Sequence, residues 1–221
     1  MSQKKLLIFG LGQAAELALF YFNSDSEYSV EAFSVDEAYM NTHEFCGLPV
    51  IAFEDVENKF LPSEYEMFIA LGYSEVNIIR KNKYIAAKQK GYNLASYVSS
   101  KATIFDTITI GDNCFILENN TIQPFASIGS NVTLWSGNHI GHHSEIGDHV
   151  FIASHVVISG GVRVGSQSFL GVNATLRDNI SIGEGCVIGA GALVNADVES
   201  HHVVKGTPSN IIFSTNVLKK I

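Results

Sequence analysis

The sequence has little cysteine, little proline and little positive charge. It contains 3 cysteines and 4 prolines among 221 residues. Cys46, Cys114 and Cys186 lack the close spacing of metal-binding motifs, and an odd number of cysteines does not predict a disulfide framework. The 14 Lys and Arg residues are outnumbered by 22 Asp and Glu residues, which gives a net charge of −8. We therefore expect no nucleic-acid-binding surface, because such a surface needs clustered Lys and Arg.

Long apolar runs are also missing. No segment reaches the roughly 18 uninterrupted apolar residues that a membrane span requires. The N-terminal apolar run is interrupted by Gly10, Gly12, Gln13 and Glu16, and no small-residue cleavage pattern follows it, in contrast to a secretory signal peptide. We therefore expect a cytoplasmic protein without a membrane span. The apolar fraction of 46% predicts a folded core, and the length allows one large or two modest domains.

The most regular feature is a six-residue repeat. An aliphatic residue recurs at every sixth position without a slip, at Val98, Ile104, Ile110, Ile116, Ile122, Ile128, Leu134, Ile140, Ile146, Ile152, Ile158, Val164, Leu170, Leu176, Ile182, Ile188 and Val194. This period fits neither an α-helix nor a hairpin, but it is typical of a solenoid of short strands with three hexads per triangular coil. An ordinary β-sandwich would need loop insertions that break the register, and none occurs. The sequence therefore predicts a parallel β-helix.

The N-terminal segment has the order of a nucleotide-binding βαβ unit. An apolar strand is predicted before Gly10 and Gly12, a helix after them, and then a second strand that ends at Asp36. Ala15 stands where the full fingerprint has its third glycine, so the two glycines could equally serve only the geometry of the turn.

Two further strands and a helix complete the predicted N-terminal domain. The strands are expected at 48–51 and 66–72, and the helix at 76–90. The apolar side of that helix would carry Ile78, Ile79, Ile85 and Ala86, and Gly91 would end it. We expect a small α/β domain over residues 1–95 and a β-helix domain over residues 96–221, which ends in a short capping helix at 211–221.

Histidines gather in one short stretch, at His139, His142, His143, His149 and His155. In the hexad frame, His142 and His143 take the third and fourth positions, where a coil turns its corner and side chains point outward. Each could simply be solvated. As an adjacent pair near Glu145 and Asp148 they can also provide a general base, because imidazole titrates near neutral pH.

The whole pattern resembles a known enzyme family. The hexads, the preceding α/β domain and the segments 140–147 (IGHHSEIG), 169–173 (FLGVN) and 205–208 (KGTP) are similar to the left-handed β-helix sugar acyltransferases. The likeness is greatest to the bacterial N-acetyltransferases of nucleotide-linked 4-amino sugars of the bacillosamine-pathway type, and it covers nearly the whole chain.

The resemblance implies a fold and an activity. The fold would be a Rossmann-like N-terminal domain followed by a left-handed parallel β-helix, in a homotrimer without a metal. The activity would be transfer of an acetyl group from acetyl-CoA to a nucleotide-linked amino sugar of the 4-amino-4,6-dideoxy type, for a surface glycan such as lipopolysaccharide O-antigen. Acetyl-CoA would lie between adjacent β-helices, and the N-terminal domain would anchor the sugar nucleotide.

The resemblance also implies site residues. His142 matches the catalytic histidine of the family, and His143 stands where the family has a glutamate, so Asp148 or a carboxylate of a neighbouring chain could orient His142. Gly10, Gly12 and Asp36 match the nucleotide-sugar contacts.

The acyl donor would be held by other residues. We expect acetyl-CoA at Gly160, Gly161, Lys205 and Gly206, with a glycine N–H that stabilises the oxyanion. A second family histidine falls on Phe151, so His149 or His155 could take its role. Trp135 and Phe125, which we expect at or near the same corner as the histidines, could line the sugar site or pack in the trimer interface.

Three alternatives remain open at the level of sequence. An O-acetyltransferase of a polysaccharide or lipid-linked sugar would use the same base with a different acceptor. A β-helix carbonic anhydrase would bind zinc through three histidines at a subunit interface, but it needs no N-terminal nucleotide-type domain. A non-enzymatic scaffold would leave the outward histidine pair unexplained.

Overall fold

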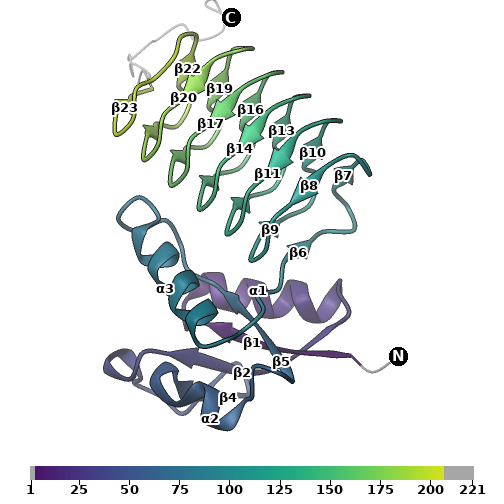
Figure 1. The fold of residues 1–221 in the computed structure, drawn as a ribbon, viewed down its shortest axis with the longest axis vertical. Helices are drawn as coiled ribbons and strands as arrows, with labels where there is room; N and C mark the ends of the chain where they lie inside the picture. Colours follow the sequence, from purple (N-terminus) through teal and green to yellow (C-terminus); the bar gives the residue numbers. More distant parts are fainter. Residues whose placement is uncertain (1–2, 207–221) are drawn as a thin grey trace, which may run out of the picture.

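The structure, a computed structural model that describes residues 3–206, consists of an α/β part and a solenoid stacked along the long axis of the molecule (Figure 1). The α/β part comes first in the chain, and the solenoid begins directly after it at Tyr97. The two parts are packed against each other without a linker.

The α/β part is a mainly parallel sheet with helices, as predicted. Its five strands lie in the order β3-β4-β2-β1-β5, and only β3 runs antiparallel to its neighbour. The strands are β1 (Lys4–Phe9), β2 (Tyr28–Val35), β3 (Glu44–Phe45), β4 (Leu48–Ala52) and β5 (Tyr65–Ile69). The helices are α1 (Gln13–Ser24), α2 (Val56–Lys59) and α3 (Ile78–Gln89), with short 3-10 turns η1 (Glu37–Tyr39) and η2 (Phe53–Asp55).

The alternation of side chains along β1 builds a core on both faces of this sheet. Leu6 and Ile8 pack in one cluster with α1, whereas Leu7 and Phe9 pack in a second cluster with residues of α2 and α3. Each of these fully buried side chains stabilises the fold by about 1.5–3 kcal/mol. The first cluster also contains Tyr97, Phe115 and Leu117 from the solenoid, so the two parts of the chain share one core.

The solenoid is a left-handed parallel β-helix with three sheets, named here after their first strands. The β6 sheet comprises β6 (Tyr97–Val98), β9 (Phe115–Ile116), β12 (Thr133–Leu134), β15 (Phe151–Ile152), β18 (Phe169–Leu170), β21 (Val187–Ile188) and β23 (Val203–Val204). The β7 sheet comprises β7 (Thr103–Ile104), β10 (Thr121–Ile122), β13 (His139–Ile140), β16 (Val157–Ile158), β19 (Thr175–Leu176) and β22 (Leu193–Val194). The β8 sheet comprises β8 (Thr109–Ile110), β11 (Ser127–Ile128), β14 (Glu145–Ile146), β17 (Arg163–Val164) and β20 (Ser181–Ile182).

The register confirms three hexads per coil. Ile122 pairs with Ile140, and Ile140 pairs in turn with Ile158, so each strand contacts the strand one coil later. The repeated aliphatic residues point inward and form one continuous core, together with small or branched residues such as Val132 and Ala174. Cys114 and Cys186 are buried in this core, whereas Cys46 is exposed.

The corners of the coil impose a backbone requirement that explains their composition. From residue 113 to residue 191, the fourth position of each hexad has a positive φ; these residues are Asn113, Asn119, Phe125, Asn131, Gly137, His143, His149, His155, Gly161, Gln167, Asn173, Asn179, Gly185 and Gly191. The left-handed region costs most residues about 1–2 kcal/mol and is easiest for Gly and Asn. Asn and Gly are accordingly the commonest residues at these corners.

The structure corrects the prediction for α3. The helix begins at Ile78 and not at residue 76, because Val76 and Asn77 have φ values of 49° and 67°. The three isoleucines predicted for its apolar side are 40–43% exposed, and Arg80 and Ala87 are buried instead. The physical reason is that α3 packs against a polar corner of the β-helix, which accepts a guanidinium better than isoleucine.

Two other expectations concern the C-terminal capping helix and membrane-spanning helices. The capping helix at 211–221 lies outside the described residues. Within residues 3–206, no helix combines the length and apolarity needed to cross a membrane.

Candidate functional site

His142 and His143 form a hydrogen-bonded pair at the corner between β13 and β14. Their Nδ1 atoms are 3.1 Å apart, and their rings meet edge to face with centroids 5.3 Å apart. Because one Nδ1 atom must donate and the other accept, the contact couples the tautomers of the two rings. When Nδ1 of His142 donates, its Nε2 carries no proton and can accept one from a substrate.

Neighbouring coils hold this pair in place. Phe125, one coil earlier, packs on the ring of His143 with centroids 4.9 Å apart. The side chain of Gln123 accepts a hydrogen bond from the backbone N–H of His142 at 3.0 Å. One coil later, a Cβ atom at position 160 would lie only 2.6 Å from Cε1 and 2.7 Å from Nε2 of His142. Glycine at position 160 therefore leaves the space that the imidazole occupies.

The two glycines beside the pair differ in their backbone amides. The N–H of Gly161 donates to the carbonyl of His142 at 2.8 Å. The N–H of Gly160 makes no hydrogen bond within residues 3–206, and this residue directly adjoins the His142 ring. Of the two predicted oxyanion donors, only Gly160 has a free amide in this part of the chain.

The other histidines occupy different corners, since each hexad advances the chain by one corner. His149 faces α3, where its Nδ1 accepts a hydrogen bond from the Asn131 side chain at 2.9 Å and the Tyr84 ring lies 5.3 Å away. Burial lowers the pKa of His149 to about 4, so this histidine is neutral at physiological pH. His155 lies at the third corner, where its ring packs beside Gly137. Neither residue adjoins His142 within one chain.

Two expected neighbours of the pair lie elsewhere. The Oδ1 atom of Asp148 accepts a hydrogen bond from the N–H of Ser130 at 2.7 Å, at the corner that also carries His149. Asp148 therefore does not orient His142 within the chain. Trp135 was expected near the histidines, but it packs on Phe151, with centroids 6.5 Å apart, beside the α/β part. Because the chain moves to the next corner every six residues, Asp148 and Trp135 belong to hexads that turn at other corners than the hexad of His142.

The glycine turn and Asp36 lie together at the carboxyl edge of the α/β sheet. Gly10 follows β1 with φ +123°, and a Cβ atom there would lie 2.9 Å from the carbonyl oxygen of Ala70. Gly12 caps the N-terminus of α1, and no atom lies within 4 Å of the space where its Cβ would be. Asp36 directly follows β2. Ligands of parallel α/β sheets bind at this edge, with phosphates near the first helix amides.

A residue that the sequence analysis missed completes this edge. Lys83 of α3 places its Nζ atom 2.5 Å from Oδ1 of Asp36, and both side chains are largely buried. The signal was absent from the sequence because Lys83 lies far along the chain, in a helix whose buried face was assigned to isoleucines.

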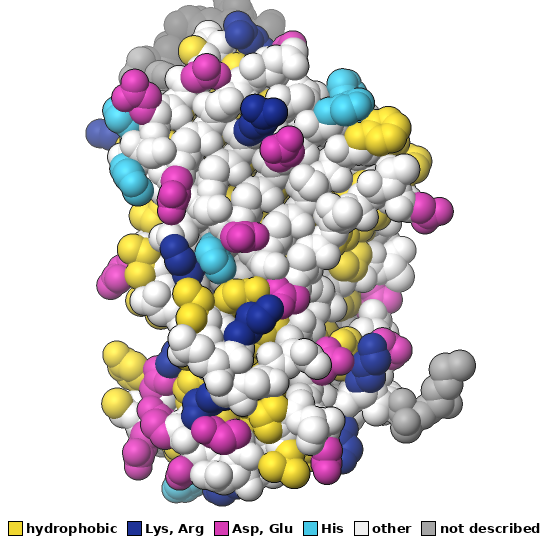
Figure 2. All heavy atoms as spheres, in the orientation of Figure 1, with side chains coloured by type: hydrophobic (Ala, Val, Ile, Leu, Met, Phe, Trp, Pro, Cys, Tyr) yellow, Lys and Arg dark blue, Asp and Glu magenta, His cyan; other side chains and the backbone are white. Residues whose placement is uncertain are grey.

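An apolar cavity of about 210 Å³ opens beside the glycine turn, between the α/β part and the β6 sheet. It is lined by Gln13, Ala14 and Leu17 of α1, by residues 68–73, and by Phe115, Thr133, Trp135 and Phe151 of the solenoid. Among residues 3–206, no three His, Cys, Asp or Glu side chains gather closely enough to hold a metal ion. Figure 2 shows acidic and basic side chains interspersed over one face of the molecule.

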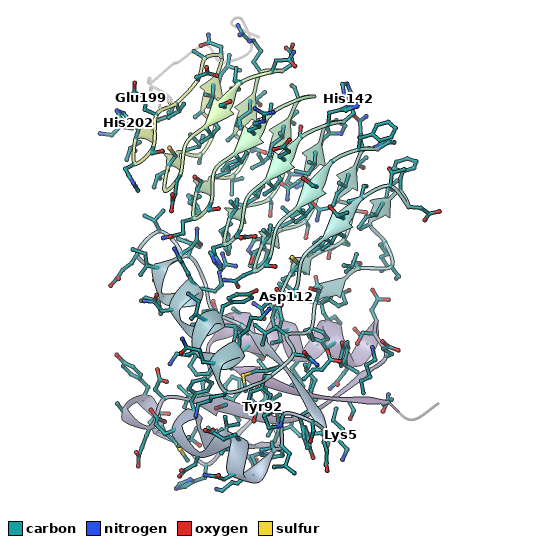
Figure 3. All side chains as sticks on the ribbon, in the orientation of Figure 1. Lys5, Tyr92, Asp112, His142, Glu199 and His202 are labelled. Carbon is teal, nitrogen blue, oxygen red and sulfur yellow. The ribbon has the colours of Figure 1, made fainter. Side chains whose placement is uncertain are left out.

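A single chain does not bring all the predicted site residues together. The α/β part packs on the β6 sheet and its two flanking corners, through contacts such as the hydrogen bond from the Tyr21 hydroxyl to Glu118 at 2.9 Å. The His142 corner lies opposite the β6 sheet, and Figure 3 shows His142 at the outer edge of the solenoid, away from the α/β part. Lys205 and Gly206 follow β23, near the C-terminal end of the solenoid.

Comparisons with known proteins identify the repeats and the fold. The bacterial transferase hexapeptide model (six repeats) matches residues 107–140, 125–160 and 161–196. The acetyltransferase domain of PglB from Neisseria gonorrhoeae FA1090 superposes with a TM-score of 0.82 at 22% identity, and the likeness covers 95% of this chain and 100% of that one. No curated protein sequence matches the chain.

Two further solved structures are similar over nearly their whole length. Perosamine N-acetyltransferase (PerB) from Caulobacter crescentus, solved with CoA and GDP-perosamine, has a TM-score of 0.82 at 21% identity, with 95% of this chain and 97% of that chain covered. WeeI from Acinetobacter baumannii AYE has a TM-score of 0.79 at 20% identity, with 94% and 99% covered. Residues 107–196 of the solenoid thus match bacterial transferase hexapeptide repeats, and the two-part fold recurs in these proteins.

Proposed function

We propose that this protein is an acetyl-CoA-dependent N-acetyltransferase that acts on a nucleotide-linked amino sugar of the 4-amino-4,6-dideoxy type, in the synthesis of a surface polysaccharide such as O-antigen. The observation that carries the proposal is the outward His142–His143 pair beside the free amide of Gly160. The match of 95% of the chain to an acetyltransferase domain and to a perosamine N-acetyltransferase supports it, because the α/β part is included in the match.

The chemistry needs a base and an oxyanion donor. The sugar amine attacks the thioester carbonyl carbon, a C–N bond forms, and Nε2 of His142 takes the proton that the nitrogen loses. The carbonyl oxygen becomes an oxyanion, which the N–H of Gly160 stabilises. The C–S bond then breaks, and the CoA thiolate leaves with the proton that His142 returns.

His143 has a positioning role in this scheme. Its Nδ1 accepts the Nδ1 proton of His142, which leaves the lone pair of His142 Nε2 available to the amine. Phe125 limits the rotation of the His143 ring by packing against it. The pair thereby replaces the histidine–carboxylate arrangement that the resemblance to the family implied.

The active form is proposed to be a homotrimer in the cytoplasm. Because the His142 corner and the carboxyl edge of the α/β sheet lie on different sides of one chain, a sugar nucleotide held by Gly10, Gly12 and Asp36 needs the histidine pair of a neighbouring chain. Acetyl-CoA would then lie between adjacent β-helices, along a path that includes Gly160, Gly161, Lys205 and Gly206.

A thiol-release assay tests the proposed reaction. Acetyl-CoA is supplied with a panel of nucleotide-linked 3-amino and 4-amino sugars, each paired with its hydroxyl counterpart. Release of CoA with a 4-amino sugar, and not with its 4-hydroxy counterpart, is the expected result. Release with the hydroxyl compounds alone would point to O-acetylation, and no release with any compound would contradict the proposal.

A further inference from the structure

Lys83 lies at the carboxyl edge of the sheet in an unusually fixed environment. Its Nζ atom is 4.9 Å from the ring centroid of Phe9, the last residue of β1, and 4.6 Å from that of Phe53, just after β4. Aromatic faces attract a cation at such distances. Together with the ion pair to Asp36, these rings hold the ammonium group over the ends of β1, β2 and β4.

The Lys83–Asp36 pair is the least exposed of the ion pairs made by the described residues. The side chains of Lys83 and Asp36 are 18% and 26% exposed, whereas those of Lys88 and Asp112 are 48% and 29% exposed. The Lys88 pair joins α3 to a corner of the solenoid, on the same helix as Lys83. Of these two ion pairs on α3, the Lys83 pair is the one that lies at the carboxyl ends of β1 and β2, beside the glycine turn.

One carboxylate oxygen of Asp36 remains available. Lys83 contacts Oδ1, and Oδ2 has no hydrogen-bond donor among residues 3–206. An acidic residue at the end of the second strand of such a sheet accepts a hydrogen bond from a ribose 2′-hydroxyl. Fixing one oxygen leaves the other oriented before the ligand binds, which reduces the entropy lost on binding.

The surroundings of Asp36 favour a neutral hydroxyl at this position. Glu37 follows Asp36, and its N–H donates to the carboxylate of Glu54 at 2.9 Å. Glu54 and the next residue, Asp55, both lie in the turn η2. These acidic side chains disfavour a second phosphate group here. Two ammonium groups lie near the Phe53 ring, and both are already paired, Lys83 with Asp36 and Lys90 with Glu57.

We propose that Lys83 is a specificity-determining residue, which orients Asp36 toward the ribose 2′-hydroxyl and makes the protein selective for ribonucleoside-diphosphate sugars over 2′-deoxyribonucleoside-diphosphate sugars. This inference rests on the proposed function, because it assigns the nucleotide that the same site takes. Lys83 acts through Asp36 and is a positioning residue.

The test compares ligands that differ only in the 2′-hydroxyl. Calorimetric binding of UDP against dUDP, and of GDP against dGDP, is measured with the full-length chain. A hydrogen bond to a charged group makes the ribose form bind about tenfold more tightly in the wild type. In Lys83→Met and in Asp36→Asn we expect this preference to fall to twofold or less, with little change for the deoxy form.

Control variants separate specificity from folding. Lys88→Met, which breaks the other ion pair on α3, should keep the full tenfold preference, and Lys83→Arg should restore most of it. In acetyl transfer to a ribonucleotide amino sugar, Lys83→Met should raise KM about tenfold and leave kcat unchanged, the signature of lost uniform binding.

Each contrary outcome has a distinct meaning. Equal binding of ribose and deoxyribose forms by the wild type, or an undiminished preference in Lys83→Met, overturns the role of Lys83 while acetyl transfer can still occur. If neither the ribose nor the deoxyribose diphosphates bind and no amino sugar nucleotide is acetylated, the proposed function fails together with it.

Discussion

A histidine next to His142 gives the proposed base a neutral partner instead of an anionic one. The 3.1 Å contact between the two Nδ1 atoms couples the tautomers of the two rings without adding a negative charge. A carboxylate partner would stabilise the imidazolium that forms during proton transfer. The His143 ring can do so only through the lone pair of its Nδ1 atom, so we expect its contribution to come mainly from holding the His142 ring in place.

Removal of His142 is predicted to abolish most of the activity. In His142→Asn the fold should remain, because the side chain is exposed at a corner that tolerates polar residues. Loss of a general base lowers turnover by roughly 100-fold or more. The measurement is kcat from thiol release, with circular dichroism as the check on folding. Turnover close to that of the wild type would exclude His142 as the base.

Removal of His143 is predicted to cost less. Asparagine occupies the equivalent left-handed corner at Asn131 and Asn179, so His143→Asn keeps the backbone conformation. Because the substitution loses only the orienting hydrogen bond, we expect turnover to fall by about tenfold, less than for a lost proton acceptor. A loss as large as that of His142→Asn would instead identify His143 as the proton acceptor.

At the scale of elements, the hexads specify nearly all of the β-helix. A fixed period of six, with Ile, Val or Leu inside each turn, leaves one register in which the aliphatic residues stack, and the structure has that register. Because each hexad ends at a different corner of the coil, histidines that are close in the sequence need not lie close together in the site. His149 and His155 are near His142 in sequence, but they turn away to other corners, and only the adjacent His143 stays beside it.

Helix α3 shows where sequence periodicity fails. Its three isoleucines point outward, and Arg80 is only 1% exposed. The pattern of apolar residues cannot reveal that the surface facing the helix is a polar corner, because that corner comes from residues 131–168. Lys83 escaped notice for the same reason, since its partner Asp36 follows β2, in another part of the chain.

The corner that faces α3 makes the stability depend on pH. The pKa of His149, about 4, lies below the ordinary value of 6.5, so the unfolded chain binds a proton more readily than the folded one. The stability is therefore complete above pH 6.5 and is lost as the pH falls toward 4, by on the order of 2–3 kcal/mol. His149→Asn, which cannot be protonated, should show a smaller fall in Tm between pH 7 and pH 4.5.

The difference in Tm between the wild type and His149→Asn, measured across pH, isolates the contribution of His149. Asparagine accepts the left-handed backbone and keeps an oxygen for the Asn131 amide. Parallel Tm curves for the wild type and His149→Asn would show that His149 does not titrate in this way.

At the scale of the whole molecule, Arg80 joins the α/β part to the β-helix. Its guanidinium donates hydrogen bonds to the carbonyls of Asn131, His149 and Val150 and to the side chain of Asn77. Burial lowers its pKa to about 10, so Arg80 stays protonated at neutral pH. No carboxylate of residues 3–206 contacts the guanidinium, and the carbonyl dipoles of the corner balance its charge.

Loss of this contact is predicted to be strongly destabilising. Arg80→Met leaves the buried carbonyls of Asn131 and His149 without a donor, whereas the Val150 carbonyl keeps its bond from the Thr133 N–H. We expect a loss of about 3–4 kcal/mol in the free energy of unfolding. Lys88→Met, which breaks a more exposed ion pair on the same helix, should cost less than about 1 kcal/mol. Urea unfolding of both variants gives the comparison, and equal costs would contradict the assigned role of Arg80.

In the proposed trimer, the histidine pair of one chain completes the nucleotide site of another. The most direct measurement is complementation between His142→Asn and Asp36→Ala chains, co-expressed with different tags and assayed below the KM of the wild type. Random mixing in a trimer gives about a quarter of the sites both an intact histidine and an intact carboxylate, so we predict about a quarter of the wild-type activity. Activity no higher than that of the separate variants would show that the site lies within one chain and would contradict the account.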